Sequence, residues 1–419
     1  MSSLVINGGR RLNGSLVAQG SKNSALPILA ATYLVNGKSI IHNCPRLSDV
    51  ECTIKILQNL GCKTERHGTD LIVDSTSASG YEIPENLMRE MRSSVVFLGA
   101  ILGRAKMAKI STPGGCEIGL RPIDLHLFAM RKLGVEIEES YGKLLCTIKD
   151  KLKGAKITLT FPSVGATENA ILLASVSEGT TTIINAAREP EIVDLANFLN
   201  KAGAKISGAG SDIITIDGVK SLGSVEYTVM PDRIVAATYL FGTAACKGRV
   251  LLKNAVSEHL SPIISCLTDC GCDISVDDRG ILLSASSTFS GFDAVSTQPY
   301  PGFPTDAGPL LVAMATVSKG TSVFVENIFD NRFRYTDELK RMGADIKTIG
   351  RVAIIKGVDC LQSAKVRADD LRGGAALLIA AMTAKGRSTI HNTEFVDRGY
   401  ENFEDMFNFL GADIKRIWE

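Results

Sequence analysis

The chain has 419 residues, of which 45% are hydrophobic, and its formal net charge is +1. This length exceeds one ordinary hydrophobic core, so we expect two domains. The near-neutral charge argues against a general nucleic-acid binder. The first residues lack the apolar core of a signal peptide, and the uncharged stretches are too short to insert into a membrane. Ten cysteines in such a chain favour a cytoplasmic protein with free thiols.

A short pattern recurs six times along the chain, as in LGCKTERHGTDLIV, AGAKISGAGSDIITI and MGADIKTIGRVAIIK. Its glycines return at intervals of about 70 residues, which indicates a repeated structural unit. These glycines are Gly61, Gly134, Gly203, Gly271, Gly343 and Gly411.

Each repeat opens with an Ala-rich apolar segment that predicts a helix buried on all sides. A short β-type run follows, then an amphipathic helix, and then a β-hairpin around GTD, YGK, AGSD, DDRG or IGR. The apolar segments span residues 24–37, 93–103, 166–179, 231–248, 306–320 and 371–386.

The repeats predict an α/β protein of two domains with three repeats each, in which buried helices lie inside outer sheets. We expect the first domain over residues 22–229, and the second over residues 230–419 together with 1–21. The chain passes from one to the other near Val225–Pro231.

The second repeat is about six to eight residues longer than the others, and the addition coincides with PGGCEIGLRP (113–122). An insertion that the repeat does not need for packing favours a function. Cys116 lies in it behind two glycines, so we expect a mobile loop with a reactive thiol. The bland alternative is a surplus loop cysteine.

Cations stand in the first turn of four of the apolar helices, where the helix dipole disfavours them. Lys22, Arg92, Arg233 and Arg372 have this placement. We expect them to bind an anion together with backbone N–H groups, with Arg121 and Arg398 adding to the charge. The alternative is that they are solvated surface side chains.

Two common phosphate motifs are incomplete. Thr32 stands where a P-loop needs glycine, and Ile213 where a dinucleotide fingerprint needs its third glycine. No pattern of metal ligands is present in the sequence. We therefore expect neither a cofactor nor a metal.

Seven stretches, taken together, resemble the enolpyruvyl transferases, and specifically the branch whose acceptor is UDP-N-acetylglucosamine. They follow the order of that family along nearly the whole chain. The stretches are GSKNSALPILAA (20–31), PGGCEIGLRPIDLH (113–126), PSVGATEN (162–169), PGFPTDAGP (301–309), ENIFDNRF (326–333), ADDLRGGAALLIA (368–380) and VDRGYENFE (396–404).

The resemblance implies two inside-out α/β barrels of three repeats each, an N-terminal strand that crosses into the second domain, and an active site between the domains. It implies transfer of the enolpyruvyl group of phosphoenolpyruvate to the 3′-hydroxyl of UDP-N-acetylglucosamine, with release of phosphate, as the first committed step of peptidoglycan synthesis. The partners are then these two small molecules, and we expect a monomer.

The resemblance also implies the roles of particular residues. Cys116 would protonate C3 of phosphoenolpyruvate and can form a covalent adduct. Asp306 would be the base for the 3′-hydroxyl, with Asp370 as the weaker alternative. Phosphoenolpyruvate would be held by Lys22, Asn23, Arg121 and Arg398. The sugar nucleotide would be held by Asn23, Arg92, Arg121, Pro122, Ile123, Asp124, Leu125, Ser163, Val164, Gly165, Asp306 and Ile328.

Simpler structural roles compete with some of these assignments. Asn23, Asp306 and Asp370 each stand where an N-cap side chain would. Arg121 and His126 should lower the pKa of the Cys116 thiol, although a lone histidine is often structural. Phe161 stands where some family members have a lysine that touches the diphosphate.

Three other functions compete with this one. A sister enzyme of the same fold uses shikimate 3-phosphate but lacks the PGGC loop. An inactive sugar-nucleotide sensor should have lost Lys22, Cys116, Asp306 or Arg398, and all four are present. An RNA-end-processing enzyme of similar repeats would need a basic surface.

Overall fold

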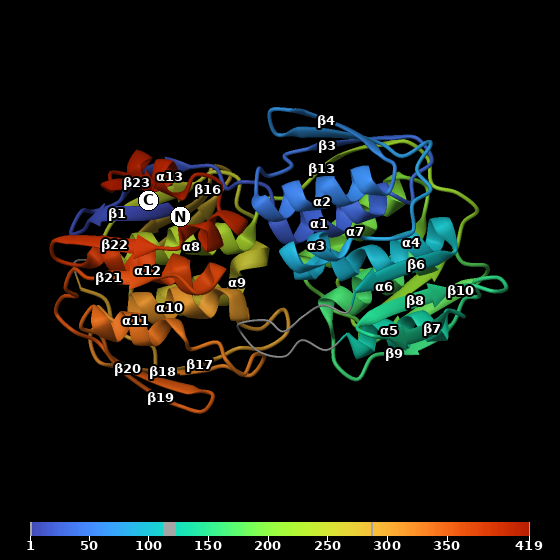
Figure 1. The fold of residues 1–419 in the computed structure, drawn as a ribbon. Helices are drawn as coiled ribbons and strands as arrows, with labels where there is room; N and C mark the ends of the chain where they lie inside the picture. Colours follow the sequence, from blue (N-terminus) through green and yellow to red (C-terminus); the bar gives the residue numbers. More distant parts are fainter. Residues whose placement is uncertain (1, 112–122, 286–287, 419) are drawn as a thin grey trace. The chain divides into compact units, whose positions relative to one another are not determined.

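The computed structural model describes residues 2–111, 123–285 and 288–418. Within them the chain forms two compact units (Figure 1). Among the described residues, the first unit comprises residues 20–111 and 123–230, and the second unit comprises residues up to 19 together with residues from 231 onwards. The finer placement of the domain boundary stays a prediction.

Each repeat contributes one small sheet. The first unit holds β13(Val225–Thr228)-β3(Lys38–His42)-β5(Asp70–Asp74)-β4(Lys63–His67), β6(Met107–Ser111)-β8(Lys143–Thr147)-β7(Glu136–Ser140), and β11(Lys205–Ser207)-β12(Ile213–Asp217)-β10(Thr180–Ile184)-β9(Lys156–Thr158). The second unit holds β15(Asp273–Asp277)-β16(Gly280–Ser284)-β14(Arg249–Leu252)-β2(Asn13–Leu16), β17(Ala294–Ser296)-β18(Thr321–Val325)-β20(Val352–Lys356)-β19(Asp345–Ile349), and β21(Lys365–Arg367)-β22(Arg387–His391)-β1(Ser2–Asn7)-β23(Ile414–Trp418). The five predicted hairpins are confirmed as antiparallel pairs.

The sheet of the last repeat is completed by the N-terminus of the chain. β1 lies antiparallel between β22 and β23, so that Leu4 faces Ile390 on one side and Arg416 on the other. It takes the position that the second hairpin strand occupies in the other repeats. The N-terminal strand therefore belongs to the second unit, as the resemblance implies.

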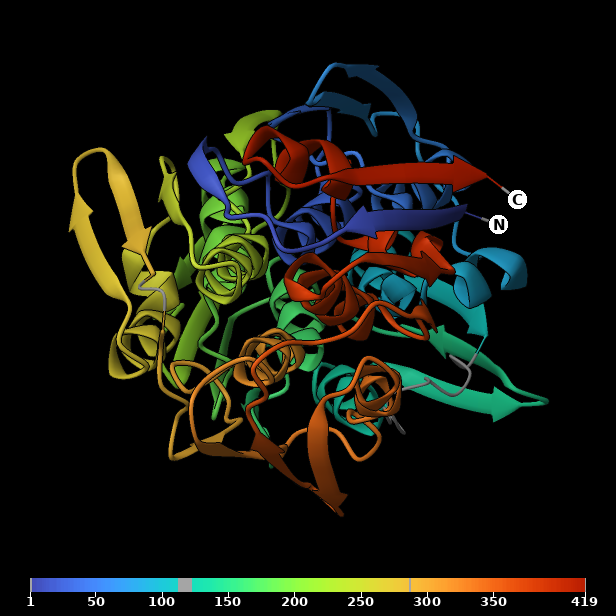
Figure 2. The same ribbon diagram turned by 90° about the vertical axis from the view of Figure 1, so that its left-hand side faces the viewer.

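The six apolar segments form the inner helices, and the prediction that they are buried is confirmed. All residues of α8 are buried, and the same holds for α10. In Figure 2 the helices of the second unit are seen nearly end on, with strands around them. The inner helices are α1(Lys22–Thr32), α4(Phe97–Ala105), α6(Val164–Ala174), α8(Arg233–Ala245), α10(Gly308–Ala315) and α12(Leu371–Thr383).

The repeated glycines end the outer helices. Gly61 follows α2 with φ +95°, and Gly203 follows α7 with φ +108°. Only glycine adopts this left-handed conformation readily, which explains why the pattern returns in every repeat. The outer helices are α2(Ser48–Asn59), α5(Asp124–Lys132), α7(Pro190–Lys201), α9(Ser261–Asp269), α11(Tyr335–Arg341) and α13(Phe403–Phe409).

The remaining helical turns are short: α3(Glu85–Glu90), and the 3-10 turns η1(Arg92–Val96), η2(Ser257–Leu260), η3(Thr305–Ala307) and η4(Thr393–Arg398). Nine cysteines lie in the described part of the chain and all are free thiols. Eight of them are buried, whereas Cys360 is only half-buried. Over the described ranges, the helices are too short or too polar to span a bilayer.

Candidate active site

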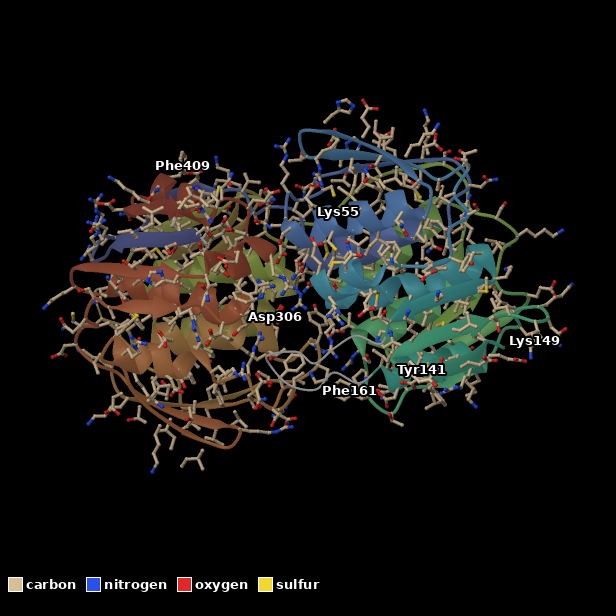
Figure 3. The ribbon with its side chains drawn as sticks, in the orientation of Figure 1. Lys55, Tyr141, Lys149, Phe161, Asp306 and Phe409 are labelled. Atoms are coloured by element: carbon tan, nitrogen blue, oxygen red, sulfur yellow. The ribbon has the colours of Figure 1, made fainter. Side chains whose placement is uncertain are left out.

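The second unit gathers two buried arginines around one carboxylate. Asp306 lies in η3 and is labelled in Figure 3. Arg332 Nη2 donates to its Oδ1 at 3.0 Å, and Arg372 Nη2 and Nε donate to its Oδ2 at 3.2 and 3.3 Å. Both guanidiniums are nearly inaccessible to solvent, while the Asp306 side chain is 29% exposed. The cluster therefore holds two guanidinium groups against one carboxylate, with one edge open to solvent.

The alternative role of Asp306 as an N-cap is wrong, because its carboxylate faces the arginines and α10 begins at Gly308 without a side-chain cap. Asp370 is an N-cap. Its Oδ1 accepts from the backbone N–H groups of Arg372 and Gly373 at 3.0 Å each. Arg332 Nη1 lies 3.9 Å from the same oxygen. Capping therefore places Asp370 beside the cluster without occupying its second oxygen.

A buried tyrosine fixes the position of Arg372. Arg372 Nη1 donates to the Tyr400 hydroxyl at 3.2 Å. That hydroxyl lies 2.8 Å from Thr238 Oγ1, whose own proton goes to the Ile234 carbonyl. Tyr400 therefore donates to Thr238. Burial raises the pKa of Tyr400, so its hydroxyl keeps the proton that it donates to Thr238.

Two other predicted residues lie in the second unit. Arg398 is the last residue of η4 and is half-buried. Ile328 lies in the loop after β18 and is also half-buried.

Arg332 Nε is buried and has no hydrogen-bond partner among the described residues. This donor remains available to an anionic ligand.

In the first unit Lys22 and Asn23 open α1. Lys22 Nζ forms an ion pair with Asp49 Oδ2 at 3.3 Å, and its side chain is 12% exposed, so the alternative of a solvated surface charge is wrong. Ser21, not Asn23, is the N-cap, since its side chain accepts from Ser24 N. The Asn23 side chain makes no hydrogen bond to the described part of the chain. Its amide is therefore available to a ligand.

The predicted cations do stand at helix starts. Arg92 is the first residue of η1 and Arg233 is the first residue of α8. Arg372 is the second residue of α12. Arg233 and Arg372 are buried, so the surface alternative is wrong for both.

The turn that opens α6 contains three predicted sugar-nucleotide contacts. Ser163 is the N-cap and accepts from Ala166 N, and Val164 and Gly165 follow it. Gly165 packs against the ring of His126, since a Cβ there would lie 2.8 Å from His126 Cε1. Phe161, two residues before the cap, is 46% exposed (Figure 3).

The expectation that His126 supplies positive charge is wrong. Burial lowers the pKa of His126 to about 4, which leaves the ring neutral at pH 7. Asn169 Nδ2 lies 2.8 Å from its Nδ1, and because the amide N–H donates, the ring proton is on Nε2. His126 therefore packs against the α6 turn as a neutral ring.

Cys116, Arg121 and Pro122 lie outside the described residues. Three predicted neighbours lie within them. Ile123 precedes α5, Asp124 is its exposed first residue, and Leu125 is half-buried.

Sequence reasoning missed Asp49 as the partner of Lys22, because the two residues are far apart in the chain. It also missed Tyr400 and the buried acid Glu168. Burial and the neighbouring carboxylates of Glu191 and Glu189 raise the pKa of Glu168 well above its usual value. Its only signal was an acidic residue inside the apolar segment ATENAILLA.

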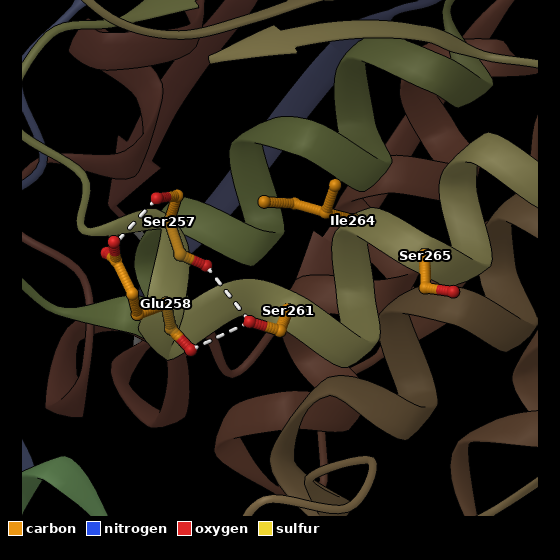
Figure 4. Close-up of a pocket in the computed structure, with 5 residues that line it drawn as sticks. All are labelled: Ser257, Glu258, Ser261, Ile264 and Ser265. Carbon is orange, nitrogen blue, oxygen red and sulfur yellow. Dashed lines mark hydrogen bonds between the residues drawn. The ribbon is translucent and has the colours of Figure 1, made fainter. Parts of the chain in front are cut away.

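A pocket at η2 and α9 is separate from these residues (Figure 4). It is lined by Ser257, Glu258, Ser261, Ile264 and Ser265. Ser261 Oγ donates to the Glu258 carbonyl at 3.0 Å, so these two lining residues hydrogen-bond to each other. None of the predicted site residues that the structure describes lines it. In the described ranges, histidine, cysteine and carboxylate side chains form no group of three placed to hold a metal.

Comparison with known families defines the class of protein. The family model of EPSP synthase (3-phosphoshikimate 1-carboxyvinyltransferase) matches residues 6–407. The enolpyruvyl transferase NikO from Streptomyces tendae has the same fold, with a TM-score of 0.89 and 25% identity, covering 99% of this chain and 98% of that one. EPSP synthase from Acinetobacter baumannii matches in fold at 19% identity, with a TM-score of 0.77 over the full length of both chains. The chain belongs to the enolpyruvyl transferase family, and the expected α/β fold of repeats is confirmed.

Curated relatives define a narrower group. The chain is 52% identical over 417 residues, covering 100% of both chains, to UDP-N-acetylglucosamine 1-carboxyvinyltransferase 2 of Caldanaerobacter subterraneus subsp. tengcongensis. It is 46% identical to UDP-N-acetylglucosamine 1-carboxyvinyltransferase 1 of Symbiobacterium thermophilum, covering 99% of this chain and 95% of that one.

Proposed function

We propose that this protein transfers the enolpyruvyl group of phosphoenolpyruvate to the 3′-hydroxyl of UDP-N-acetylglucosamine and releases phosphate, at the first committed step of peptidoglycan synthesis. The observation that carries the proposal is identity of 52% over the full length to a relative named for this reaction. We place the enzyme in the cytoplasm as a monomer, and size-exclusion chromatography tests the latter.

The reaction is an addition followed by an elimination. The 3′-oxygen bonds to C2 of phosphoenolpyruvate while C3 gains a proton and the hydroxyl loses one. The C–O bond to phosphate then breaks, C3 gives up a proton, and the double bond returns. The chemistry needs groups that bind anions, a proton donor and a base.

The described residues supply candidates for anion binding in both units. Lys22 in the first unit and Arg398 in the second are assigned to phosphoenolpyruvate, together with Asn23 and Arg121. We add Arg332 and Arg372 for its carboxylate. The free Nε of Arg332 supports this, because it gives the cluster a donor beyond those that Asp306 uses.

Asp306 is assigned as the base for the 3′-hydroxyl. Its partial exposure supports the assignment, since a substrate hydroxyl must reach an oxygen that the arginines also contact. Asp370 is the alternative, but both backbone N–H groups at the start of α12 already bind its Oδ1. Cys116 is assigned as the proton donor to C3.

Arg92, Ile328 and the Ser163–Gly165 turn are assigned to the sugar nucleotide, with residues 121–125. The N-terminal N–H groups of α6 support binding of a diphosphate there. Phe161 supplies no charge at this turn, so the diphosphate depends on backbone donors and Arg121.

Phosphate release from phosphoenolpyruvate tests the proposal with UDP-N-acetylglucosamine, shikimate 3-phosphate or no acceptor. We expect release only with the sugar nucleotide. Release with shikimate 3-phosphate would favour the sister reaction. Calorimetric binding of the sugar nucleotide without any turnover would instead indicate a sensor.

The base assignment has its own test. Asp306→Asn should lower kcat by about 10²–10⁴-fold if Asp306 takes the proton. Asp369→Asn removes the charge of a half-buried carboxylate paired with Arg367; it is the matched control and should leave kcat unchanged. A larger loss in Asp370→Asn than in Asp306→Asn would transfer the role to Asp370.

Alkylation tests the thiol. The epoxide fosfomycin should inactivate the wild type and label Cys116, and Cys116→Ser should abolish labelling. Cys360→Ser is the matched control, because Cys360 is the one half-buried thiol among the described cysteines. Labelling that persists in Cys116→Ser would contradict the assignment.

A further inference from the structure

One buried carboxylate in the second unit has no counterpart in the other repeats. Glu326 follows β18 and is 1% exposed. In four other repeats the residue at the same distance from the glycine before the strand is asparagine: Asn43, Asn185, Asn254 and Asn392. Glu326 stands at that position in the fifth repeat.

Three of these asparagines, Asn43, Asn185 and Asn254, bridge neighbouring strands. Asn43 Nδ2 donates to the Val229 carbonyl and Asn185 Nδ2 to the Leu159 carbonyl, both at 2.9 Å. Each of these carbonyls follows the parallel strand next in the sheet. Asn254 likewise bonds the backbone of Ala18: its Oδ1 accepts from Ala18 N at 2.6 Å, and its Nδ2 donates to the Ala18 carbonyl at 2.8 Å.

In the fifth repeat this bridge is made one residue later. Asn327 Nδ2 donates to the Thr297 carbonyl at 3.2 Å, and Thr297 directly follows the parallel strand β17. Asn327 therefore does the structural task of the asparagines. Glu326 is a residue that the bridge between strands does not need.

Glu326 instead holds two loops in place. Its Oε1 accepts from Ile328 N at 2.7 Å, Phe329 N at 3.1 Å and Thr297 Oγ1 at 2.9 Å. Its Oε2 accepts from Thr305 Oγ1 at 2.8 Å. The bonds thus run to the residue before Asp306 and to Ile328 itself.

The direction of these bonds is set by the neighbours. Thr297 Oγ1 accepts from Asn327 N at 2.8 Å, so its proton is free to point at Glu326. Oε1 then receives three donors and must be an acceptor. Thr305 Oγ1 can reverse its role, because its bond to Glu326 is its only side-chain hydrogen bond among the described residues. On the other side of Thr305, Arg332 Nη2 donates to its carbonyl at 3.3 Å.

We propose that Glu326 is a positioning residue of the transfer reaction, which sets Asp306 through Thr305 and the sugar-nucleotide contact Ile328 through its backbone N–H. It touches neither substrate. The inference rests on the proposed function of the site.

Three substitutions separate hydrogen bonding from charge. Glu326→Gln keeps all four bonds, because the amide oxygen replaces Oε1 and the amide nitrogen donates to Thr305 Oγ1. Glu326→Asn restores the residue of the other repeats but is one methylene too short, and Glu326→Ala removes every bond. Asn254→Ala, at the same position of the fourth repeat, is the matched control.

Kinetics should show a loss of about 100-fold in kcat/KM for UDP-N-acetylglucosamine in Glu326→Ala and Glu326→Asn. We expect KM to rise and kcat to fall, whereas a merely unfolded fraction would lower kcat alone. Glu326→Gln and Asn254→Ala should stay near the wild type. Thr305→Val removes only the bond through which Glu326 acts on Asp306 and leaves the bonds to the Ile328 loop in place. It should therefore lower kcat with little change in KM.

Amide hydrogen exchange gives a readout that needs no turnover. The Ile328 and Phe329 N–H groups should exchange faster in Glu326→Ala but not in Glu326→Gln. If Glu326→Ala keeps wild-type kinetics, if Glu326→Gln fails as badly as alanine, or if Asn254→Ala loses as much, the inference is overturned. A wild type that never uses the sugar nucleotide would refute the proposed function instead. The exchange result would still test whether Glu326 holds the Ile328 loop in place.

Discussion

Buried clusters of ionisable side chains in the two units differ in the charge of their neighbours. In the second unit, Arg332 and Arg372 lie against the carboxylate of Asp306. In the first unit, Glu168 lies among other carboxylates, and His126 is buried as a neutral ring. Guanidinium groups keep their charge at any physiological pH, whereas the Glu168 carboxyl and the His126 ring avoid charge by holding or losing a proton.

The difference teaches which buried cluster depends on ion pairing and which on pH. Removing one arginine in the second unit breaks a buried ion pair and leaves one oxygen of Asp306 without its donor. Changing the pH acts on the first unit, because its buried groups take up or release protons on unfolding. Four predictions test this contrast.

The largest effect is expected for Arg372→Met. The substitution leaves Asp306 Oδ2 and the Tyr400 hydroxyl without the donor that Arg372 supplies, while Arg332 still donates to Asp306 Oδ1. It should lower the free energy of unfolding by about 3–5 kcal/mol. Urea titration followed by circular dichroism measures it. Arg367→Met removes an exposed arginine, paired with Asp369, and should cost less than about 1 kcal/mol. Equal losses would show that the buried cluster is not special.

The second prediction concerns His126. Its pKa of about 4 lies below the usual 6.5, so the unfolded chain binds a proton first as the pH falls. Wild-type stability should therefore drop by about 3 kcal/mol relative to His126→Gln between pH 6.5 and pH 4. Urea titrations at three pH values measure the difference. The same substitution at exposed His67 should show no comparable drop.

Glu168→Gln should act in the opposite pH direction. The raised pKa of Glu168 means that the folded state holds a proton that the unfolded state loses above its ordinary pKa. Stability from this group is lost as the pH rises, so the glutamine variant should melt a few degrees higher at pH 8 and no higher at pH 4.5. Scanning calorimetry measures the shift. Glu178→Gln, at a 63% exposed side chain, is the control.

The smallest effect belongs to His42 on the surface of the first unit. Hydrogen bonds to Glu226 and Asp70 raise its pKa. Its stabilisation is present below the ordinary pKa of histidine and is lost as the pH rises through the raised value. His42→Gln should cost less than about 1 kcal/mol at pH 6 and nothing at pH 9. A cost that grows with pH would contradict the ion pairs.

Local signals predicted most of the fold. The periodic glycines mark left-handed turns after Leu60 and Ala202, and the apolar segments mark the inner helices, because both depend on the conformation and burial of neighbouring residues. The strand partners could not be predicted in this way. β13 pairs with β3, and β2 with β14, across long separations that the sequence pattern does not encode.

The same division applies to the candidate site. Sequence placed Lys22 and Arg372 at helix starts, and capping chemistry alone identifies Asp370 as an N-cap. An N-cap was also the alternative role for Asp306, and there the carboxylate instead contacts two arginines from other elements of the fold. It also read His126 as a cation, whereas burial removes its charge.

The sequence by itself determined the repeats, their buried helices, the hairpins and the cations at the helix starts, because each follows from residues close together in the chain. Only the tertiary structure decided which carboxylate meets which cation and which titratable groups stay neutral. Asp49 meets Lys22, and Glu326 meets Thr305, from separate elements of the fold. Charge in a protein interior depends on burial and on neighbours in space, and neither is fixed until the chain has folded.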